Sequence, residues 1–401
     1  MRILVQKFGG SSVADLECMK KVRTKVLAAR EEGYKVVVVL SARAGQTNGL
    51  LERAYQWSDE PDLAELDVLL TTGEQESVAL FSMLLHDAGV KARSILGFQI
   101  PIITDDSFGS ARIDSIDATR LRELFETYDV LVMAGFQGRT PDMRLTTLGR
   151  GGSDTSAVAI AAALGDETRC DIYTDVDGVY TTDPRMCKAA HKLDRICYDE
   201  MLELASMGAK VLQIRSVEIA EKYNVPVRVR STFSNDPGTL VTKEDDMMES
   251  VLVSGIAFDK DQARITLYDV QDRPGTAASI FNPLGDAGIV VDMIIQTASR
   301  NGVTDMAFTV SRKDVKRAIA VLEQAGHDVN KIESASNIAK VSVVGVGMRN
   351  HSGVSGRVFD CLHKAGINLI MISTSEVKIS CLVNEADLEL AVNVMHKEFD
   401  L

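Results

Sequence analysis

Two glycine-rich segments of this chain have the residue types that bind anions. Residues 7–13 read Lys-Phe-Gly-Gly-Ser-Ser-Val, between an apolar strand pattern and a helical pattern. Glycines let backbone N–H groups approach a phosphate, the helix N-terminus adds partial positive charge, and Lys7 adds a full charge. Residues 148–156, Leu-Gly-Arg-Gly-Gly-Ser-Asp-Thr-Ser, lie in the same context. One such segment is often only a turn, but two indicate a phosphate donor that meets an anionic acceptor.

Two further segments add side chains suited to holding an ammonium and a polar head group. Ser41 and Thr47 lie just after a second strand pattern, and Glu74 lies at a helical turn over residues 71–74. Two hydroxyls and one carboxylate would form such a site. The same residues also serve as turn caps and as a solvated helix charge. Spacing alone leaves both interpretations open.

Residues 173–185 and Lys210 suggest a nucleotide site. The segment reads Tyr-Thr-Asp-Val-Asp-Gly-Val-Tyr-Thr-Thr-Asp-Pro-Arg, and its Asp-Gly turn is equally typical of an ordinary hairpin. Lys210 begins an apolar helical pattern, where its charge opposes the helix dipole and so favours a nearby anion. The sequence contains neither a P-loop nor a G-x-G-x-x-G motif at the start of a Rossmann unit. The anion-binding segments still predict phosphoryl transfer, although these common signatures are missing.

The expected chemistry depends on the acceptor. A carboxylate acceptor is already ionised at pH 7, so the reaction requires no general base and depends on alignment and charge neutralisation. None of the six histidines is a catalytic candidate, which agrees with this scheme. The candidate neutralising groups are Lys7, Lys210, Arg150 and a magnesium ion.

Composition limits the class of protein. The 401 residues suggest two or three domains, and 45% hydrophobic with 25% charged residues is typical of soluble globular proteins. A net charge of -13 without a basic cluster argues against nucleic acid, and no apolar run reaches the length of a membrane span. The polar start is unlike a signal peptide, so we expect a cytoplasmic protein. Six scattered cysteines favour neither disulfides nor a zinc site, and no protein-held metal site is expected.

Residues 1–240 alternate between strand and helix patterns. Strands are expected at residues 3–8, 35–41, 94–104, 130–134, 171–175 and 225–229. Helices are expected at residues 13–32, 62–88, 116–128, 154–164 and 209–223. This order predicts an α/β fold, a mostly parallel sheet covered by helices on both faces. Both glycine segments then lie beyond the carboxyl ends of strands, where such sheets bind ligands.

The remaining chain contains a duplication. After an acidic linker at residues 241–249, a shift of 78 residues places Gly275 on Gly353 and Phe281 on Phe359. Such matching indicates two units of about 70 residues, each with the order strand, helix, strand, strand, helix. The second unit reaches Leu401 without a fourth strand. We expect residues 250–259 to supply it, which gives one unit at residues 263–335 and another at residues 250–262 plus 336–401.

Taken together, these motifs resemble those of the aspartate kinases. The resemblance covers essentially the whole chain, including residues 7–13, 148–156, 173–185, 208–212 and the duplicated tail. It implies ATP-dependent phosphorylation of the side-chain carboxylate of L-aspartate to 4-phospho-L-aspartate, the first step toward lysine, threonine and methionine. It also implies an amino-acid kinase fold followed by two ferredoxin-like ACT units.

The resemblance implies roles for individual residues. Lys7 would stabilise the transferred phosphoryl group, Asp154 would orient the active-site lysine and arginine, and Arg150 would hold the α-carboxylate of aspartate while Glu74 holds its ammonium. The other aspartate-binding candidates are Ser41, Thr47, Gly151, Gly152 and Ser153. The ATP-binding candidates are Lys7, Phe8, Gly9, Gly10, Ser12, Thr174, Asp175, Tyr180, Arg185, Lys210 and Val211, with Mg²⁺ held mainly by the nucleotide phosphates. One departure is Ala44, where many relatives carry glycine.

The tail implies regulation and assembly. ACT pairs in this family bind amino acids and usually dimerise, so we expect feedback inhibition by lysine, threonine or both, and a homodimer or higher oligomer. A short subunit initiated internally at Met247 or Met248 is a further candidate partner. The candidate effector contacts are Asp272, Ala277, Val291, Asp292, Gln296, Asn368, Leu369, Thr374 and Ser375.

Two other functions stay open. Enzymes with the same fold phosphorylate other amino-acid carboxylates, such as glutamate or its N-acetyl form. Those enzymes generally lack the ACT pair. A non-catalytic amino-acid sensor with a degenerate kinase half is the second alternative. The charges at Lys7, Glu74, Arg150, Asp154 and Lys210 argue against decay of the site.

Overall fold

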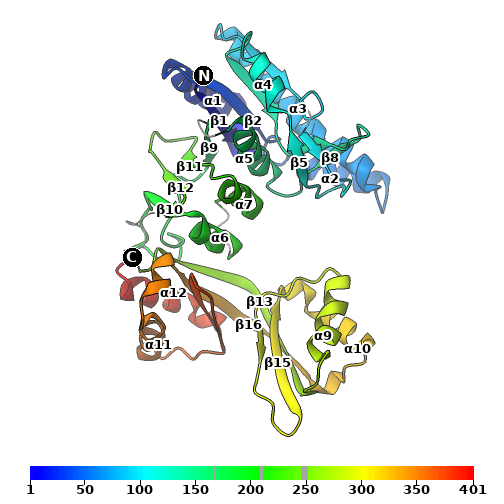
Figure 1. Ribbon diagram of the computed structural model, residues 1–401, viewed down its shortest axis with the longest axis vertical. Helices are drawn as coiled ribbons and strands as arrows, with labels where there is room; N and C mark the ends of the chain where they lie inside the picture. The colour runs from blue at the N-terminus through cyan, green and yellow to red at the C-terminus, as the bar shows by residue number, and fades with distance from the viewer. Residues whose placement is uncertain (101, 166–167, 208–210, 245–251) are drawn as a thin grey trace. The chain divides into compact units, whose positions relative to one another are not determined.

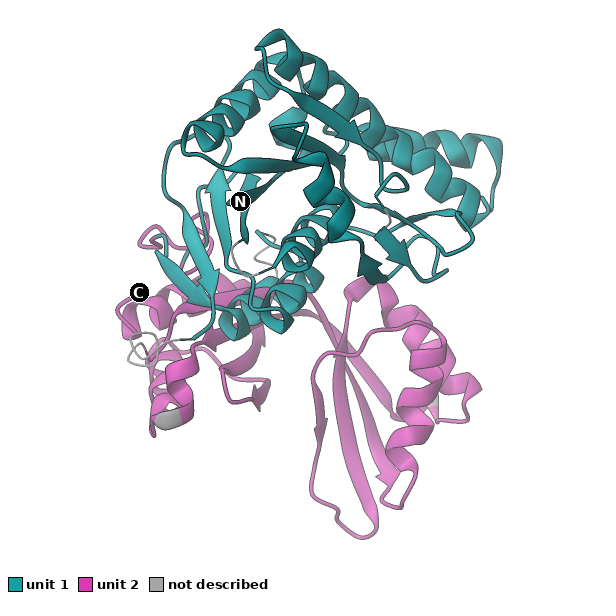
Figure 2. Cartoon of the chain, turned by 45° about the horizontal axis from the view of Figure 1, so that its top comes forward, with its two compact units in different colours: residues 1–180, 192–248 teal, residues 181–191, 249–401 magenta. Residues whose placement is uncertain are grey.

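The computed structural model describes residues 1–100, 102–165, 168–207, 211–244 and 252–401. The chain forms two compact units (Figure 2). The first contains residues 1–180 and 192–248, and the second contains residues 181–191 and 249–401. Lys210 and the methionines at 247 and 248 lie outside the described residues.

The first unit is built on an eight-stranded sheet with the order β10-β12-β11-β9-β1-β2-β6-β3 (Figure 1). Its strands are β1 (Ile3–Phe8), β2 (Lys35–Leu40), β3 (Ala92–Ile95), β6 (Val130–Ala134), β9 (Thr168–Thr174), β10 (Arg195–Cys197), β11 (Val227–Ser231) and β12 (Thr239–Thr242). Only the β11–β12 pair is antiparallel among the described pairs of this sheet. The predicted mostly parallel sheet is confirmed.

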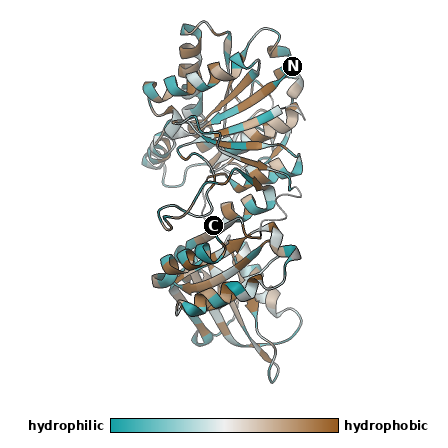
Figure 3. Ribbon diagram, turned by 90° about the vertical axis from the view of Figure 1, so that its left-hand side faces the viewer, coloured by the Kyte–Doolittle hydropathy of each residue, from teal (hydrophilic) through white to brown (hydrophobic). Residues whose placement is uncertain are grey.

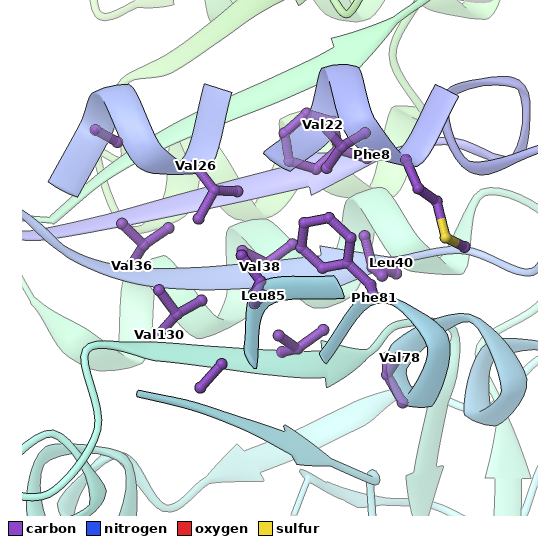
Figure 4. Packing of buried hydrophobic residues seen from close by; sticks show 14 of the residues in the cluster. Phe8, Val22, Val26, Val36, Val38, Leu40, Val78, Phe81, Leu85 and Val130 are labelled. Carbon is purple, nitrogen blue, oxygen red and sulfur yellow. The ribbon is translucent and has the colours of Figure 1, made fainter. Parts of the chain in front are cut away.

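Helices cover both faces of this sheet. On one face, α1 (Leu16–Glu31) and α3 (Leu63–Asp87) pack Val22, Val26, Phe81 and Leu85 against alternate residues of β1, β2 and β6 (Figure 4). Helix α5 (Gly152–Leu164) packs on β1, β2 and β9 but contributes nothing to that cluster, so it covers the opposite face. Burial on both faces explains the continuous apolar run of β2.

A second sheet of this unit departs from the expected pattern. The strand expected over residues 94–104 is wrong as one element, because its ends become β3 and β4 (Ile102–Thr104) in different sheets. The chain turns between them at Gly97, where a Cβ would lie 2.9 Å from Gln137. The four-stranded sheet has the order β5-β4-β7-β8, with β5 (Ile113–Ile116), β7 (Gln137–Arg139) and β8 (Leu145–Thr147). Its short strands have no clear alternation and were not expected.

Most of the predicted helices of this unit are shorter than their sequence patterns, whereas α5 begins slightly earlier than predicted. Helix α1 begins later than predicted, at Leu16, because the Asp15 side chain accepts a hydrogen bond from Cys18 N at 2.8 Å and caps its N-terminus. The other helices of the unit are α2 (Gln46–Trp57), α4 (Ala118–Leu124), α6 (Tyr198–Ser206) and α7 (Ile214–Lys222). Neither α2 nor α6 was expected.

The second unit is a six-stranded antiparallel sheet with the order β14-β15-β13-β16-β18-β17. Its strands are β13 (Gly255–Gln271), β14 (Ile294–Gln296), β15 (Val303–Val310), β16 (Ile332–Val344), β17 (Met371–Thr374) and β18 (Lys378–Asn384). Its helices are α9 (Thr276–Asp286), α10 (Val315–Gln324), α11 (Val354–Lys364) and α12 (Leu388–Glu398). They mix hydrophobic and hydrophilic residues, as helices packed on a sheet by one face do (Figure 3).

Two long strands join the duplicated halves of this sheet. Residues 255–259 of β13 pair with residues 340–344 of β16, while residues 264–267 pair with residues 332–335. The strand missing from the second repeat therefore comes from the segment before the first repeat. This pairing is the one that the nested arrangement requires, and the domain bounds themselves stay a prediction.

Residues 181–191 come from the middle of the front half but pack within the second unit. The buried Cys187 belongs to the same core as Ile256, Val343 and Val392. Thr181 Oγ1 lies 2.9 Å from His396 Nε2, and Asn393 Nδ2 donates to Met186 O at 3.0 Å. No pattern in the sequence signalled this exchange.

Among the described helices, none has the length and hydropathy required to span a membrane.

Candidate active site

The Gly9–Gly10 turn and the residues around Glu74 are joined by one short segment, residues 42–44. Ala44 N donates to Gly10 O at 3.1 Å, and Ala42 N donates to Glu74 Oε1 at 2.9 Å. A Cβ on Gly10 would lie 2.8 Å from Ala42 O, so only glycine permits this approach. Three segments that are separate in the sequence therefore meet beyond the carboxyl ends of β1 and β2.

Lys7 and Asp154 form a buried ion pair between β1 and α5. Their Nζ and Oδ1 atoms lie 2.6 Å apart, and the two side chains are only 11% and 12% exposed. The carboxylate lies in the first turn of α5, where the helix dipole favours negative charge. The ammonium lies 3.4 Å from where a Cβ of Gly9 would be. Lys7 is therefore held above the Gly9–Gly10 turn, where it can neutralise an anion.

Glu74 has one carboxylate oxygen without a partner. The residue is 3% exposed, and its Oε1 accepts the bond from Ala42 N. Its Oε2 is buried and has no hydrogen-bond partner in the described part of the chain. Burial raises the pKa of Glu74 to about 7. A buried unpaired oxygen of this kind is suited to a cationic or N–H ligand.

The second glycine segment is a turn that leads directly into α5. Gly149 and Gly151 have φ angles of 77° and 73°, which favour glycine, and α5 begins at Gly152. Ser153 is buried near Gly135, where a Cβ would lie 2.8 Å from Ser153 Oγ. Arg150 is exposed, and its guanidinium forms no ion pair with another described residue. The turn presents one free cation beside a helix N-terminus.

The other predicted acceptor residues lie in the segment that contacts Glu74. Ser41 N donates to Phe8 O at 3.2 Å, and Thr47 lies in the first turn of α2, which follows Gly45 at φ 79°. Arg43, beside the unusual Ala44, turns to Glu76, with Nη2 2.7 Å from Oε1. This ion pair directs the arginine toward α3. The sequence analysis did not single out Glu76, which lies two residues after Glu74 in α3.

The predicted nucleotide residues are less uniform. Phe8 is fully buried and stacks on Tyr173, with ring centroids 4.6 Å apart, so only its backbone is available. The buried Ser12 hydroxyl contacts Thr232 Oγ1 at 2.7 Å. Thr174 Oγ1 donates to Asp175 Oδ1, and the Tyr180 hydroxyl donates to Asp177, each at 2.9 Å.

Two nucleotide candidates are not brought to this site by the described geometry. Arg185 belongs to residues 181–191 of the second unit, where its side chain is 90% exposed and pairs with Asp183 at 2.7 Å. Lys210 lies outside the described residues, while Val211 beside it is half-buried. Among the described residues, no group of three His, Cys, Asp or Glu side chains could hold a metal ion.

The predicted effector residues occupy equivalent places in the two repeats. Asp292 lies before β14 and Leu369 before β17, while Gln296 and Thr374 end these strands. Asp272 follows β13, and its N donates to Gly302 O at 2.9 Å. Ala277 lies in the first turn of α9, and the remaining candidates flank β14 and β17, at Val291, Asn368 and Ser375. Asp292 is already partnered, because it forms an ion pair with the buried Lys340.

Comparisons with known proteins cover both units. Residues 2–231 match the amino acid kinase family, and residues 264–327 and 341–399 each match an ACT domain. An aspartokinase of Pseudomonas aeruginosa is 50% identical over 100% of this chain and 98% of its own length. A Helicobacter pylori aspartokinase (strain 26695) is 47% identical over 100% of this chain and 99% of its own length.

Two solved structures of the Escherichia coli aspartokinase III are similar at 29% identity. The complex with aspartate and ADP has a TM-score of 0.80 over 100% of both chains. The complex with lysine and aspartate has a TM-score of 0.78 over 99% of both chains.

The buried ion pair leads to a prediction about stability. Removal of either partner leaves the charge of the other uncompensated. Lys7→Met and Asp154→Asn should therefore couple by about 1–3 kcal/mol in a double-mutant cycle. Urea denaturation measures the free energies of unfolding. The exposed Lys20–Glu17 pair is the control and should couple by about 0.3 kcal/mol. A coupling at Lys7–Asp154 as small as the control would contradict the interpretation.

Proposed function

This chain belongs to the aspartokinases of the amino acid kinase family, with two ACT domains after its kinase domain, and we propose that it transfers the γ-phosphoryl group of ATP to L-aspartate. The product is 4-phospho-L-aspartate, with ADP as the leaving group. The observation that carries the proposal is the joining of the Gly9–Gly10 turn to Glu74 through residues 42–44. A cradle for the donor and a carboxylate for the acceptor's ammonium thereby share one rigid connection.

The acceptor is held by its two ends. The unpartnered Oε2 of Glu74 accepts the α-ammonium, and the free guanidinium of Arg150 binds the α-carboxylate. Hydroxyls of Ser41, Thr47 and Ser153, with the backbone of Gly151 and Gly152, complete this site. The side-chain carboxylate is then free to point at the donor.

Lys7 and the Gly9–Gly10 turn hold the donor phosphates. The further nucleotide contacts are Phe8 through its backbone, Ser12, Thr174, Asp175, Tyr180, Lys210 and Val211. Magnesium would be held mainly by the nucleotide phosphates. Bound there, the ion would neutralise phosphate charge.

The reaction requires alignment and charge neutralisation. An oxygen of the aspartate side-chain carboxylate bonds to the γ-phosphorus, and the bond from that phosphorus to the bridging oxygen breaks, leaving ADP. Two like unit charges about 4 Å apart repel by roughly 4 kcal/mol at an effective dielectric of 20. Lys7, oriented by Asp154, opposes this repulsion, and no general base is needed because the acceptor is ionised.

We extend the proposal to regulation and cellular role. The enzyme catalyses the first step toward lysine, threonine and methionine in the cytoplasm, as a homodimer or higher oligomer through its ACT domains. A short subunit starting at Met247 or Met248 is part of this proposal. Lysine, threonine or both inhibit it at the equivalent sites of the two ACT repeats. The lysine complex of the E. coli aspartokinase III supports an amino-acid effector.

Acceptor specificity tests the activity. With ATP and hydroxylamine, which traps acyl phosphates as hydroxamates, aspartate should give product while glutamate and N-acetylglutamate give none. Lys7→Met should reduce the aspartate signal by about 100-fold or more, because it removes transition-state charge stabilisation. Product with another acceptor alone would select a different amino-acid kinase, and silence with all acceptors would select a sensor.

The raised pKa of Glu74 predicts the pH dependence of aspartate binding. Only the ionised carboxylate pairs with an ammonium, so KM for aspartate should rise as the pH falls below about 7. At pH 6 KM for aspartate should be about tenfold higher than at pH 8.5, because only about one tenth of the Glu74 carboxylates are then ionised. Initial rates between pH 5.5 and 8.5 measure it, with KM for ATP as the internal control. In Glu74→Gln, KM should be high at every pH; a profile unchanged from the parent would exclude Glu74.

Titration of activity with lysine and threonine, singly and together, tests the regulatory proposal. At least one of these conditions should inhibit. Gln296→Ala should raise the concentration for half inhibition about tenfold, as expected when a ligand loses a hydrogen bond to its charged group. Half inhibition at the parent concentration would remove Gln296 from the effector site.

A further inference from the structure

The segment that carries Arg150 depends on other elements for its conformation. Gly149 and Gly151 both have positive φ, and residues 149–151 precede the first turn of α5. Glycines in succession leave a chain many alternative conformations, so the observed turn needs contacts from outside. Five backbone groups of residues 147–150 receive such contacts, and most of the residues that provide them lie far away in the sequence.

Arg215 of α7 holds the carbonyl before the turn. Its Nη1 donates to Leu148 O at 2.7 Å, and its Nη2 donates to Ala111 O at 2.9 Å. The planar guanidinium therefore bonds two carbonyls in a fixed geometry, which an ammonium cannot reproduce. Because Ala111 N also donates to Thr147 O at 2.9 Å, the arginine fixes two neighbouring chain segments together.

Gln213, the residue before α7, holds the carbonyl of Arg150 itself. Its Nε2 donates to Arg150 O at 2.7 Å. The same side chain packs on the turn, because a Cβ added to Gly151 would lie 2.8 Å from Gln213 Cβ. The peptide that follows Arg150 is thereby fixed, while its guanidinium stays exposed.

Two more residues hold the other side of the turn. Phe136 has φ 69°, which is unfavourable for an aromatic residue. Two hydrogen bonds hold it in this conformation: its O accepts from Leu148 N at 2.8 Å, and its N donates to Ser156 Oγ at 3.1 Å. The buried Asp67 of α3 accepts from Thr147 N at 2.8 Å and from Gly109 N at 2.9 Å. The turn is thus held by bonds from Asp67 of α3, from Phe136 just before β7, and from Gln213 and Arg215 at the start of α7.

We propose that Arg215, with Gln213, positions Arg150 for the α-carboxylate of aspartate. The inference rests on the proposed function, which gives Arg150 that contact. Arg215 does not itself touch the substrate in this scheme. It acts by restricting the backbone of residues 148–150, so that the exposed guanidinium is directed to one place before the acceptor binds. Alignment of this kind is sensitive, since a displacement of about 1 Å can lower the rate about 100-fold.

A double-mutant cycle on activity tests this positioning role. Arg215→Ala and Arg150→Ala should each raise KM for aspartate about 10-fold to 100-fold, with KM for ATP changed less than about twofold. Added to Arg150→Ala, the Arg215→Ala change should raise KM for aspartate less than about twofold further, because no guanidinium is left to position. Arg215→Lys keeps the charge but cannot bond both carbonyls in the same geometry. Its KM for aspartate should lie between those of Arg215→Ala and the parent.

Arg122→Ala is the matched control. The Arg122 guanidinium also donates to a backbone carbonyl of α5, that of Leu164, but at the far end of the helix. Its loss should leave KM for aspartate within about twofold of the parent. If Arg215→Ala fails to fold, Gln213→Ala replaces it in the same cycle and should raise KM for aspartate at least about threefold.

Three results would overturn the proposal. They are an unchanged KM for aspartate in Arg215→Ala, multiplicative effects in the double variant, and equal rises of both KM values. An unchanged KM for aspartate in Arg150→Ala would instead remove the proposed α-carboxylate contact, and the positioning role would fall with it. The single variants therefore distinguish the two failures.

Discussion

The ion pair between Lys7 and Asp154 is the interaction on which the arrangement of the kinase unit depends. It joins the end of the central strand β1 to the first turn of α5, and so brings together the two glycine segments that those elements carry. Few buried cations are stable without a partner. Asp154 therefore compensates the charge of Lys7 and holds its ammonium in one place.

Glycine makes the rest of this site possible by close approach. Gly10 lies against Ala42 O, Gly73 against the Ala42 side chain, and Gly135 against Ser153, and in each case a Cβ would lie 2.8 Å from its neighbour. The loops consequently pack at distances that direct backbone hydrogen bonds require, as at Ala44 N and Gly10 O. Gly10, Ala42 and Gly73 are therefore parts of one packed structure, in which a shift of one loop displaces its neighbour.

The second unit is built by exchange of segments. Residues 255–259 complete the sheet of the second repeat, and residues 181–191, which follow the nucleotide candidate Tyr180 directly, contribute Cys187 to its core. Thr181 Oγ1 lies 2.9 Å from His396 Nε2, so this segment also bonds to the last helix of the unit.

Local chemistry and periodicity determined much of this protein in the sequence itself. The alternation of apolar strands and helices predicted the mostly parallel sheet, and the spaced duplication predicted the two repeats. The glycine motifs led to the prediction of an anion site with Lys7 and Arg150. These features are carried by residues close in the chain, or by patterns that repeat.

Only the tertiary structure decided which distant residues meet. The unpartnered Oε2 of Glu74, the bonds from Arg215 and Gln213 to the Arg150 turn, and the transfer of residues 181–191 to the second unit have no local signature. Each depends on the packing of elements that are tens of residues apart or more. The free energy of such contacts comes from burial and geometry, which a sequence pattern of period two or 3.6 does not encode.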